Sequence, residues 1–207
     1  MGKGWRKVPG SKRLLRNEGT RSLAKRFLIV CEGVETEPNY FNNFGSSWIE
    51  VEAIGGKGQW RKVVEAAEEL ANDDGGFDEV WCVFDRDIDG KNATAKPLFM
   101  EALNLARARG FKVAYSIDAF ELWYLLHFGF YDIATSRDDY SSKLTARLGK
   151  IYKKSDPLIY SELIDKQNIA IKNARKLHHE THGGTESYDN DPCTTVYLLV
   201  EALIENQ

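Results

Sequence analysis

The amino-acid sequence lacks any long apolar segment. No apolar run approaches the roughly 20 residues that a helix needs to cross a bilayer, so we expect no membrane span. The basic N-terminal residues are not followed by the apolar stretch of a secretion signal, and we expect no such signal. Internal repeats are absent as well. Together these absences favour a globular protein of the cytoplasm.

Cysteine is also scarce, and its placement excludes several classes of site. The chain has three cysteines, Cys31, Cys82 and Cys193, an odd number without the spacing of metal ligands. We therefore expect reduced thiols, two of them in buried strands, as is usual in the cytoplasm. The absence of zinc-ribbon cysteines argues against a primase-like nucleotidyl transferase.

Charge is distributed unevenly along the chain. Residues 1–26 contain nine Lys or Arg and one acid, Glu18, a net charge of +8; because the whole chain carries −3, the remaining residues carry −11. Residues 1–24 show no apolar period, and we expect them to form a basic, flexible arm. Such an arm on an acidic body is typical of contact with nucleic acid or an acidic partner. A solvated extension without a partner fits the same pattern.

The first half of the chain alternates predicted strands with predicted helices. The 207 residues, 43% of them hydrophobic, suit one globular domain. The α/β alternation predicts a four-stranded, mainly parallel sheet between helices, forming a core over residues 25–118. The expected strands are 26–31, 48–54, 79–84 and 111–116, and the expected helices are 37–44 capped by Thr36, 59–71, and 95–109 with Leu98, Ala102, Leu105 and Ala106 inward.

The last ninety residues show helical patterns without the alternating strands of the first half. They predict a helical part, 119–207, that packs on the core. It begins with a buried helix over 119–128 and a polar stretch over 132–154. A longer helix over 161–180 and a loop over 181–190 follow. The pair Asp191-Pro192 then suggests the cap and first turn of a final helix.

Carboxylates follow two of the predicted buried strands. Glu32 ends the run Phe27 to Cys31, and Asp85 and Asp87 end the run Val80 to Phe84. The carboxyl ends of parallel strands share one sheet edge, so these three side chains should meet there. Neighbouring carboxylates repel one another, and hard oxygen ligands suit Mg²⁺ or Mn²⁺. We therefore predict a divalent metal site at Glu32, Asp85 and Asp87.

Four blocks of sequence carry a resemblance to a known family. They are CEGVETEPNYF at 31–41, VWCVFDRD at 80–87, FELWYLLH at 120–127 and DPCTTV at 191–196. Together they resemble the RloB (AbiLii-like) family of bacterial phage-defence proteins. Glu-Gly after the first strand and Asp-x-Asp after a later one are also similar to the Toprim domain of topoisomerases, primases and OLD-type nucleases. That likeness implies a Toprim-like core and an acid/base role for Glu32.

Glu121 is a further catalytic candidate. It lies among aromatic residues just after the predicted fourth strand, so Asp118 and Glu121 would reach the same crevice. Pairing of Glu121 with His127 or with a lysine inside the core is an equally good interpretation. His127 itself is more typical of a core histidine than of a base. Asp89 suits a turn with Gly90 slightly better than a third aspartate ligand.

Weaker candidates lie around the central acids. Lys57 in the Gly-rich loop 55–58 and Arg86 between the two aspartates are candidates for nucleic-acid or phosphate contact, and Glu37 is a second-tier candidate at a helix start. The run of three histidines at 178–182 departs from the H-E-x-x-H zinc motif at its second position. A solvated helix end explains it better than zinc.

Three functions compete on this sequence. The leading hypothesis is Mg²⁺-dependent hydrolysis of phosphodiester bonds in nucleic acid, by a Toprim-type nuclease that acts in abortive infection. The resemblance also implies an AAA-type ATPase partner. The alternative is a non-catalytic or nucleotide-binding effector subunit of an ATPase-partnered defence complex. The sequence does not distinguish DNA from RNA, including tRNA, as the substrate. Nucleotidyl transfer is the weakest of the three hypotheses.

Overall fold

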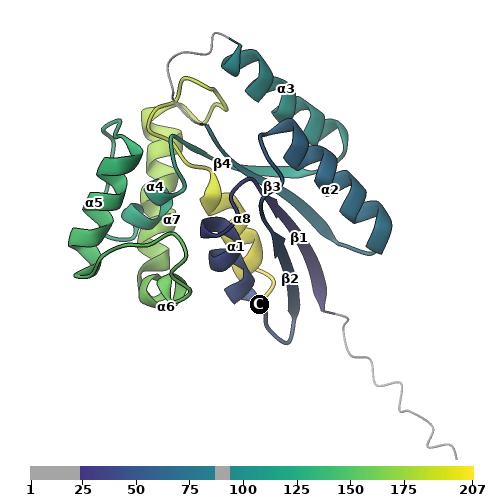
Figure 1. Cartoon of the computed structure of the whole chain (residues 1–207), viewed down its shortest axis with the longest axis horizontal. Coiled ribbons are helices and arrows are strands. Elements are labelled where there is room, and N and C mark those ends of the chain that lie inside the picture. Colours follow the sequence, from purple (N-terminus) through teal and green to yellow (C-terminus); the bar gives the residue numbers. More distant parts are fainter. Residues whose placement is uncertain (1–23, 87–93) are drawn as a thin grey trace, which may run out of the picture.

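A four-stranded parallel sheet forms the centre of the protein (Figure 1). The computed structural model describes residues 24–86 and 94–207. The strands lie in the order β2-β1-β3-β4, and each neighbouring pair is parallel. The predicted parallel sheet is confirmed. The strands are β1 (Lys25–Cys31), β2 (Ile49–Ile54), β3 (Glu79–Arg86) and β4 (Lys112–Ile117).

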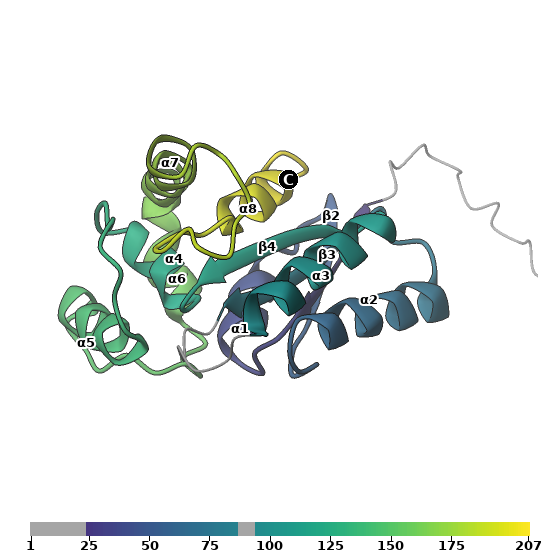
Figure 2. The same ribbon diagram turned by 90° about the horizontal axis from the view of Figure 1, so that it is seen from above.

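Helices cover both faces of this sheet and extend beyond its carboxyl edge. Figure 2 shows α2 and α3 on one face and α8 on the other, with α4, α5 and α6 grouped past the strand ends. The helices are α1 (Thr36–Phe41), α2 (Arg61–Asp74), α3 (Ala95–Ala108), α4 (Glu121–Leu126), α5 (Arg137–Leu148), α6 (Ile159–Leu163), α7 (Gln167–Lys176) and α8 (Val196–Ile204). Within the described ranges, none of them has both the length and the apolar character of a transmembrane helix.

The pleat of the strands divides the core between the two faces. Phe27 and Ile29 of β1 are buried in the cluster that contains α1, α4, α7 and α8. Leu28 and Val30 are buried in the cluster with α2 and α3. Because both faces are covered, the strands read as continuous apolar runs rather than as an alternating pattern. The three cysteines are free and buried.

The inward face of α3 differs from the predicted one. Leu98 was expected inside, but 47% of its surface is exposed. Phe99 occupies the core instead, with edge-on ring contacts to Trp60, Phe84 and Tyr115. The larger aromatic side chain gains more from burial than leucine does, so the inward stripe is centred one residue later than predicted.

The predicted start of the last helix is wrong. Asp191-Pro192 does not cap a helix; its peptide bond is cis and α8 begins at Val196. The residues between run along the outer edge of β4, where the Ile117 amide donates to the Cys193 carbonyl at 2.7 Å and the Thr195 amide donates to the Tyr115 carbonyl at 2.8 Å. This segment satisfies backbone groups that an edge strand would otherwise expose.

Two other helix predictions need correction. Thr36 does not cap the helix after β1; it is the first residue of α1, which ends at Phe41 and continues as a 3-10 turn, Asn42–Phe44. The single helix expected over 161–180 is divided into α6, a 3-10 turn over Ile164–Lys166, α7, and a π-helical turn over Leu177–Thr181. Periodicity alone does not show such breaks, because α6, α7 and the π-helical turn all bury apolar residues in one cluster, whereas Ile164, in the 3-10 turn, is turned outward.

His127 is a core histidine, as expected, and follows the last residue of α4. Its side chain is buried, and Nδ1 donates to the Trp123 carbonyl at 2.9 Å. Burial penalises the imidazolium form and lowers the pKa of His127 from 6.5 to about 4. The folded protein therefore holds His127 neutral.

This burial predicts a specific loss of stability in acid. Between pH 6.5 and about pH 4, the unfolded chain takes up a proton that the folded chain does not, so stability falls as the pH falls. We expect the stability advantage of the wild type over His127→Gln to shrink by about 3 kcal/mol across this window. Urea unfolding at several pH values measures it.

Leu125→Ala, in the same helix, is the control, because leucine does not titrate. Its difference from the wild type should stay constant over the same pH range. A constant difference for His127→Gln as well would show that the folded protein accepts the proton.

Candidate functional site

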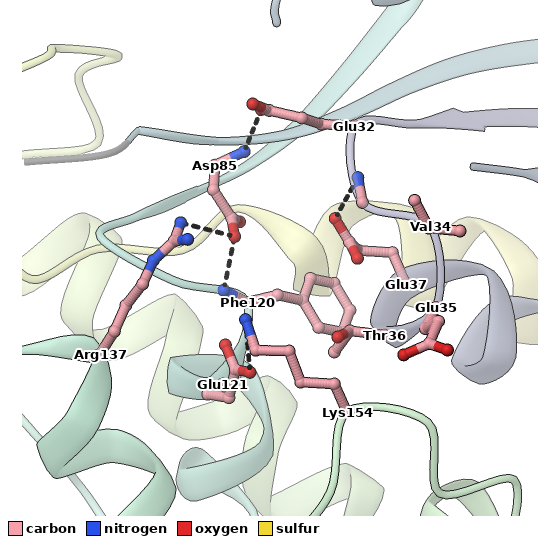
Figure 3. A pocket seen from close by; sticks show the side chains of 11 residues that line it. Glu32, Val34, Glu35, Thr36, Glu37, Asp85, Phe120, Glu121, Arg137 and Lys154 are labelled. Atoms are coloured by element: carbon pink, nitrogen blue, oxygen red, sulfur yellow. Dashed lines mark hydrogen bonds and ion pairs between the residues drawn. The ribbon is translucent and has the colours of Figure 1, made fainter. Parts of the chain in front are cut away.

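A pocket lies at the carboxyl edge of the sheet, between the strand ends and the helical part. It encloses about 400 Å³. Figure 3 shows its walls: Glu32 and Asp85 enter from the strand ends, Glu37 from α1, and Glu121, Arg137 and Lys154 from the helical part. The lining residues are Glu32, Gly33, Val34, Glu35, Thr36, Glu37, Asp85, Phe120, Glu121, Arg137 and Lys154.

Glu32 and Asp85 meet where β1 and β3 end. The two strands are paired directly, with Cys31 opposite Val83, and the Glu32 amide donates to the Val83 carbonyl at 2.9 Å. The Asp85 amide in turn donates to Glu32 Oε2 at 3.3 Å. The parallel register therefore brings together two of the three acids that the sequence placed at this edge.

Among the residues that the structure describes, the Asp85 carboxylate has partners on only one of its two oxygen atoms. Its Oδ2 accepts a hydrogen bond from the Phe120 amide at 3.0 Å and lies 3.6 Å from Arg137 Nη2. Its Oδ1 is buried and has no hydrogen-bond partner within the described residues. Burial, reinforced by the negative charges of Glu37 and Glu121, raises the pKa of Asp85 well above its usual value. Such a carboxylate would be stabilised by a cation at Oδ1.

Glu37 belongs to the same pocket, and it explains the glycine beside Glu32. The Glu37 carboxylate is buried in the first turn of α1 and accepts a hydrogen bond from the Gly33 amide at 3.2 Å. A Cβ on Gly33 would overlap this carboxylate. Gly33 is not at positive φ, so the close approach of the Glu37 carboxylate, and not a special backbone conformation, requires glycine here. Burial raises the pKa of Glu37.

Glu121 both lines the pocket and has a structural partner. Its side chain is 3% exposed, accepts a hydrogen bond from the Tyr152 hydroxyl at 3.1 Å and lies 3.5 Å from Lys154 Nζ. The two sequence interpretations, a pocket acid and a partner of a lysine, thus describe one arrangement. The predicted alternative partner His127 bonds to Trp123 instead.

Arg137 and Lys154 are pocket residues that the sequence reasoning missed. Arg137 is the first residue of α5, and its Nε and Nη2 donate to the Asp118 carbonyl at 3.1 and 3.0 Å. Lys154 lies in the segment between α5 and α6. Both stand in polar stretches without a motif, so no local signal distinguishes them from other surface cations. Only packing of the helical part on the sheet brings them to the pocket.

Other predicted residues lie elsewhere. Lys57 does not line the pocket. Arg86 is buried and holds the segment before α8: its guanidinium donates to the Tyr188 carbonyl and lies 3.2 Å from Asp191 Oδ2. Asp118 contributes its carbonyl to Arg137 rather than a carboxylate to the pocket wall. Asp87 and Asp89 lie outside the described residues.

The histidine run forms no metal site in the described part of the chain. It ends a helical segment, and His179, Glu180 and Thr181 are exposed as expected for a solvated helix end, but part of the run is fixed by contacts. His178 is buried, and both His178 Nδ1 and His179 Nε2 hydrogen-bond the Tyr197 hydroxyl at 3.0 Å. His182 Nε2 donates to the Pro192 carbonyl at 2.8 Å. These contacts fasten the π-helical turn to α8 and to the segment before it.

The pocket suits Mg²⁺ or Mn²⁺ in donor chemistry, and two predicted ligand residues line it, although their contact joins the Glu32 carboxylate to the Asp85 backbone amide and not to the Asp85 carboxylate. Glu32 and Asp85 supply hard oxygen atoms from adjacent strands, and the unpartnered Asp85 Oδ1 favours a cation. Within residues 24–86 and 94–207, however, no three His, Cys, Asp or Glu side chains converge as a ready-made site. A complete ligand set would therefore need the third predicted ligand, Asp87, or water.

The family model described as RloB-like protein matches residues 27–203. The chain belongs to the RloB-like family. The match spans most of the chain, including the sheet, the pocket and the helical part, so both walls of the pocket belong to the family's common region. No curated protein and no solved structure matches the chain.

The contact between Gly33 and Glu37 gives a testable prediction. Gly33→Ala places a methyl group where the Glu37 carboxylate lies, so Glu37 must move and lose its bond to the Gly33 amide. We expect a loss of about 1–3 kcal/mol in the free energy of unfolding, the usual cost of overpacking. Chemical denaturation measures it.

Gly45→Ala is the matched control, because no atom lies within 4 Å of the added methyl group and its φ of −56° suits alanine. It should leave stability unchanged or slightly raised. In a Glu37→Ala background, Gly33→Ala should cost clearly less than in the wild type. Equal costs in the two backgrounds would contradict the proposed contact.

Proposed function

We propose that this protein is a Mg²⁺-dependent nuclease of the Toprim type that acts in defence against phage. The observation that carries the proposal is the meeting of Glu32 and Asp85 at the carboxyl ends of adjacent parallel strands, inside a pocket. Membership of the RloB-like family supports the defence role.

The side chains would divide the work by their chemistry. Asp85 and Asp87 would hold Mg²⁺, together with or adjacent to Glu32. The bound ion would neutralise charge that develops on the phosphate. Glu32 would move the proton of the attacking water or of the leaving oxygen, because its carboxylate is held beside Asp85 yet is only partly buried. The basic residues among 1–26 would add sequence-independent attraction to the nucleic-acid backbone.

A binding role is the second candidate. Asp85 Oδ2 already has partners in Phe120 and Arg137, and no three-ligand cluster is preformed in the described ranges. This favours an effector subunit that binds nucleic acid or a nucleotide while an AAA-type ATPase partner drives the response. We propose such a partner in either case, on the family resemblance.

A nuclease assay separates these functions. Purified protein with Mg²⁺ or Mn²⁺ should cut at least one member of a panel of single- and double-stranded DNA, RNA and tRNA. Glu32→Gln should lower kcat at least about 100-fold, because Gln cannot carry the proton. It should fold normally, since its amide oxygen can still accept the hydrogen bond from the Asp85 amide.

Glu52→Gln is the control for contaminating nuclease and for a general charge effect. Glu52 is an exposed acid on β2 of the same sheet, outside the pocket. Its variant should cut like the wild type. Full activity in Glu32→Gln would overturn the catalytic assignment, and inactivity of the wild type on the whole panel would favour the binding subunit.

Metal binding can be tested without turnover. At about 100 times its dissociation constant, Mn²⁺ stabilises a protein by about 2.7 kcal/mol. For a chain of this length, we expect the melting temperature to rise by about 5–10 °C. The double variant Asp85→Asn with Asp87→Asn should abolish the rise, while the asparagine side chain keeps an oxygen that can accept from the Phe120 amide. An undiminished rise would place the metal elsewhere.

A further inference from the structure

The helical wall of the pocket carries the opposite charge to the sheet wall. Arg137 faces Asp85, which comes from the strand ends, while Lys154 lies beside Glu121 of α4 on the helical side (Figure 3). The nitrogen–oxygen distances, 3.6 Å between Arg137 and Asp85 and 3.5 Å between Lys154 and Glu121, are longer than those of ordinary hydrogen bonds. The side chains of Arg137 and Lys154 are also 43% and 52% exposed.

Both cations are held in place by groups on the helical side. The Asp118 carbonyl accepts from two nitrogens of Arg137, which fixes the plane of the guanidinium beside Asp85. Glu121, itself held by the Tyr152 hydroxyl, lies beneath Lys154 Nζ. An ammonium group has three donors, so Lys154 retains donors for a further acceptor. The two cations are therefore placed in advance on one wall.

The net charge of the pocket limits which ligands Arg137 and Lys154 can bind. Five acids line the pocket, Glu32, Glu35, Glu37, Asp85 and Glu121, against the two bases. A pocket with this excess of acid repels an anion as it stands. A divalent cation among the strand-end carboxylates would remove most of the excess and leave the two cations facing it. Anion binding and metal binding should therefore be coupled.

We propose that Arg137 and Lys154 bind the phosphate of a nucleic-acid strand on the helical wall of the pocket, and that they do so only when a divalent cation occupies the carboxylate wall. This inference rests on the proposed function, since it takes the ligand to be nucleic acid. Glu121 is then a positioning residue for Lys154 rather than a metal ligand. Phosphate oxygens accept from guanidinium and ammonium groups through charge-assisted hydrogen bonds, which gives each cation a direct role in affinity.

The test measures binding instead of cleavage. Fluorescence anisotropy follows short labelled single strands of DNA and of RNA, with Ca²⁺ in place of Mg²⁺ to suppress turnover. We expect Arg137→Met and Lys154→Met each to weaken binding about 10- to 100-fold, the usual effect of losing a charge-assisted hydrogen bond. Chelation of Ca²⁺ should weaken the wild type to a similar extent.

Matched controls lie close by in the chain. Lys153→Met removes the same charge from the exposed neighbour of Lys154, and Arg147→Met removes an exposed arginine from the same helix as Arg137. Both should bind within about twofold of the wild type, since they lose only screened, longer-range attraction. Arg137→Lys keeps the charge but not the planar fork and should bind between wild type and Arg137→Met; it also serves if Arg137→Met does not fold.

The outcomes separate this inference from the proposed function. Wild-type affinity in Arg137→Met and Lys154→Met, or binding that is indifferent to Ca²⁺, would overturn the inference even if the protein cuts nucleic acid. Metal-dependent binding that both variants lose, in a protein that cuts nothing, would uphold the phosphate site and overturn the nuclease. If Lys153→Met weakens binding as much as Lys154→Met does, the loss of affinity comes from net charge alone, and this result would also overturn the inference.

Discussion

Parallel pairing of β1 with β3 is the constraint on which the rest of the site depends. The two strands are adjacent in the sheet although about fifty residues separate them in sequence. Because both run in the same direction, Glu32 and Asp85 reach the same edge, and the Asp85 amide can bond the Glu32 carboxylate. An antiparallel pairing would send the two acids to opposite ends of the sheet. The apolar cover on both faces stabilises this pairing, since the buried apolar residues of β1 and β3 belong to the two clusters that the sheet forms with the helices.

The acids at that edge create an electrostatic problem that the helical part partly solves. The charges of Glu37 and Glu121 oppose the ionisation of Asp85, and the charge of Glu121 also opposes that of Glu37. The amide of Phe120, the guanidinium of Arg137 and the ammonium of Lys154 supply positive charge in return. All three come from residues beyond β4. The helical part is therefore one wall of the site, and it shares a hydrophobic cluster with the strands.

The loops around the pocket depend on close approach of backbone groups. Gly33 lies against the Glu37 carboxylate, and a Cβ on Gly55 would meet the Gly33 carbonyl and Pro38. The Gly56 amide donates to that same carbonyl at 3.0 Å. The glycine-rich loop after β2 thus supports the turn that carries Glu32. This packing explains Gly55, and positive φ explains Gly56 and Gly58, so the loop needs no bound phosphate to account for its glycines.

The sequence by itself determined the fold class and the position of the principal acids. Apolar runs ending in Glu32 and Asp85 predict buried parallel strands, because only strands covered on both faces are apolar throughout. Because parallel strands end at the same edge of a sheet, their direction alone places both residues at the carboxyl edge. Local pattern also placed all four strands within one or two residues of their observed ends.

Tertiary structure decided the rest, because it depends on contacts between distant segments. Whether Leu98 or Phe99 faces inward is settled by the rings of Trp60 and Tyr115, which no local periodicity reveals. The segment after Asp191 runs beside β4 instead of starting a helix because the edge of that strand needs partners. Arg137 and Lys154 become pocket residues only when α5 and the segment after it fold back over the strand ends. The sequence shows that these two residues are charged, but only the folded structure shows which acids they face.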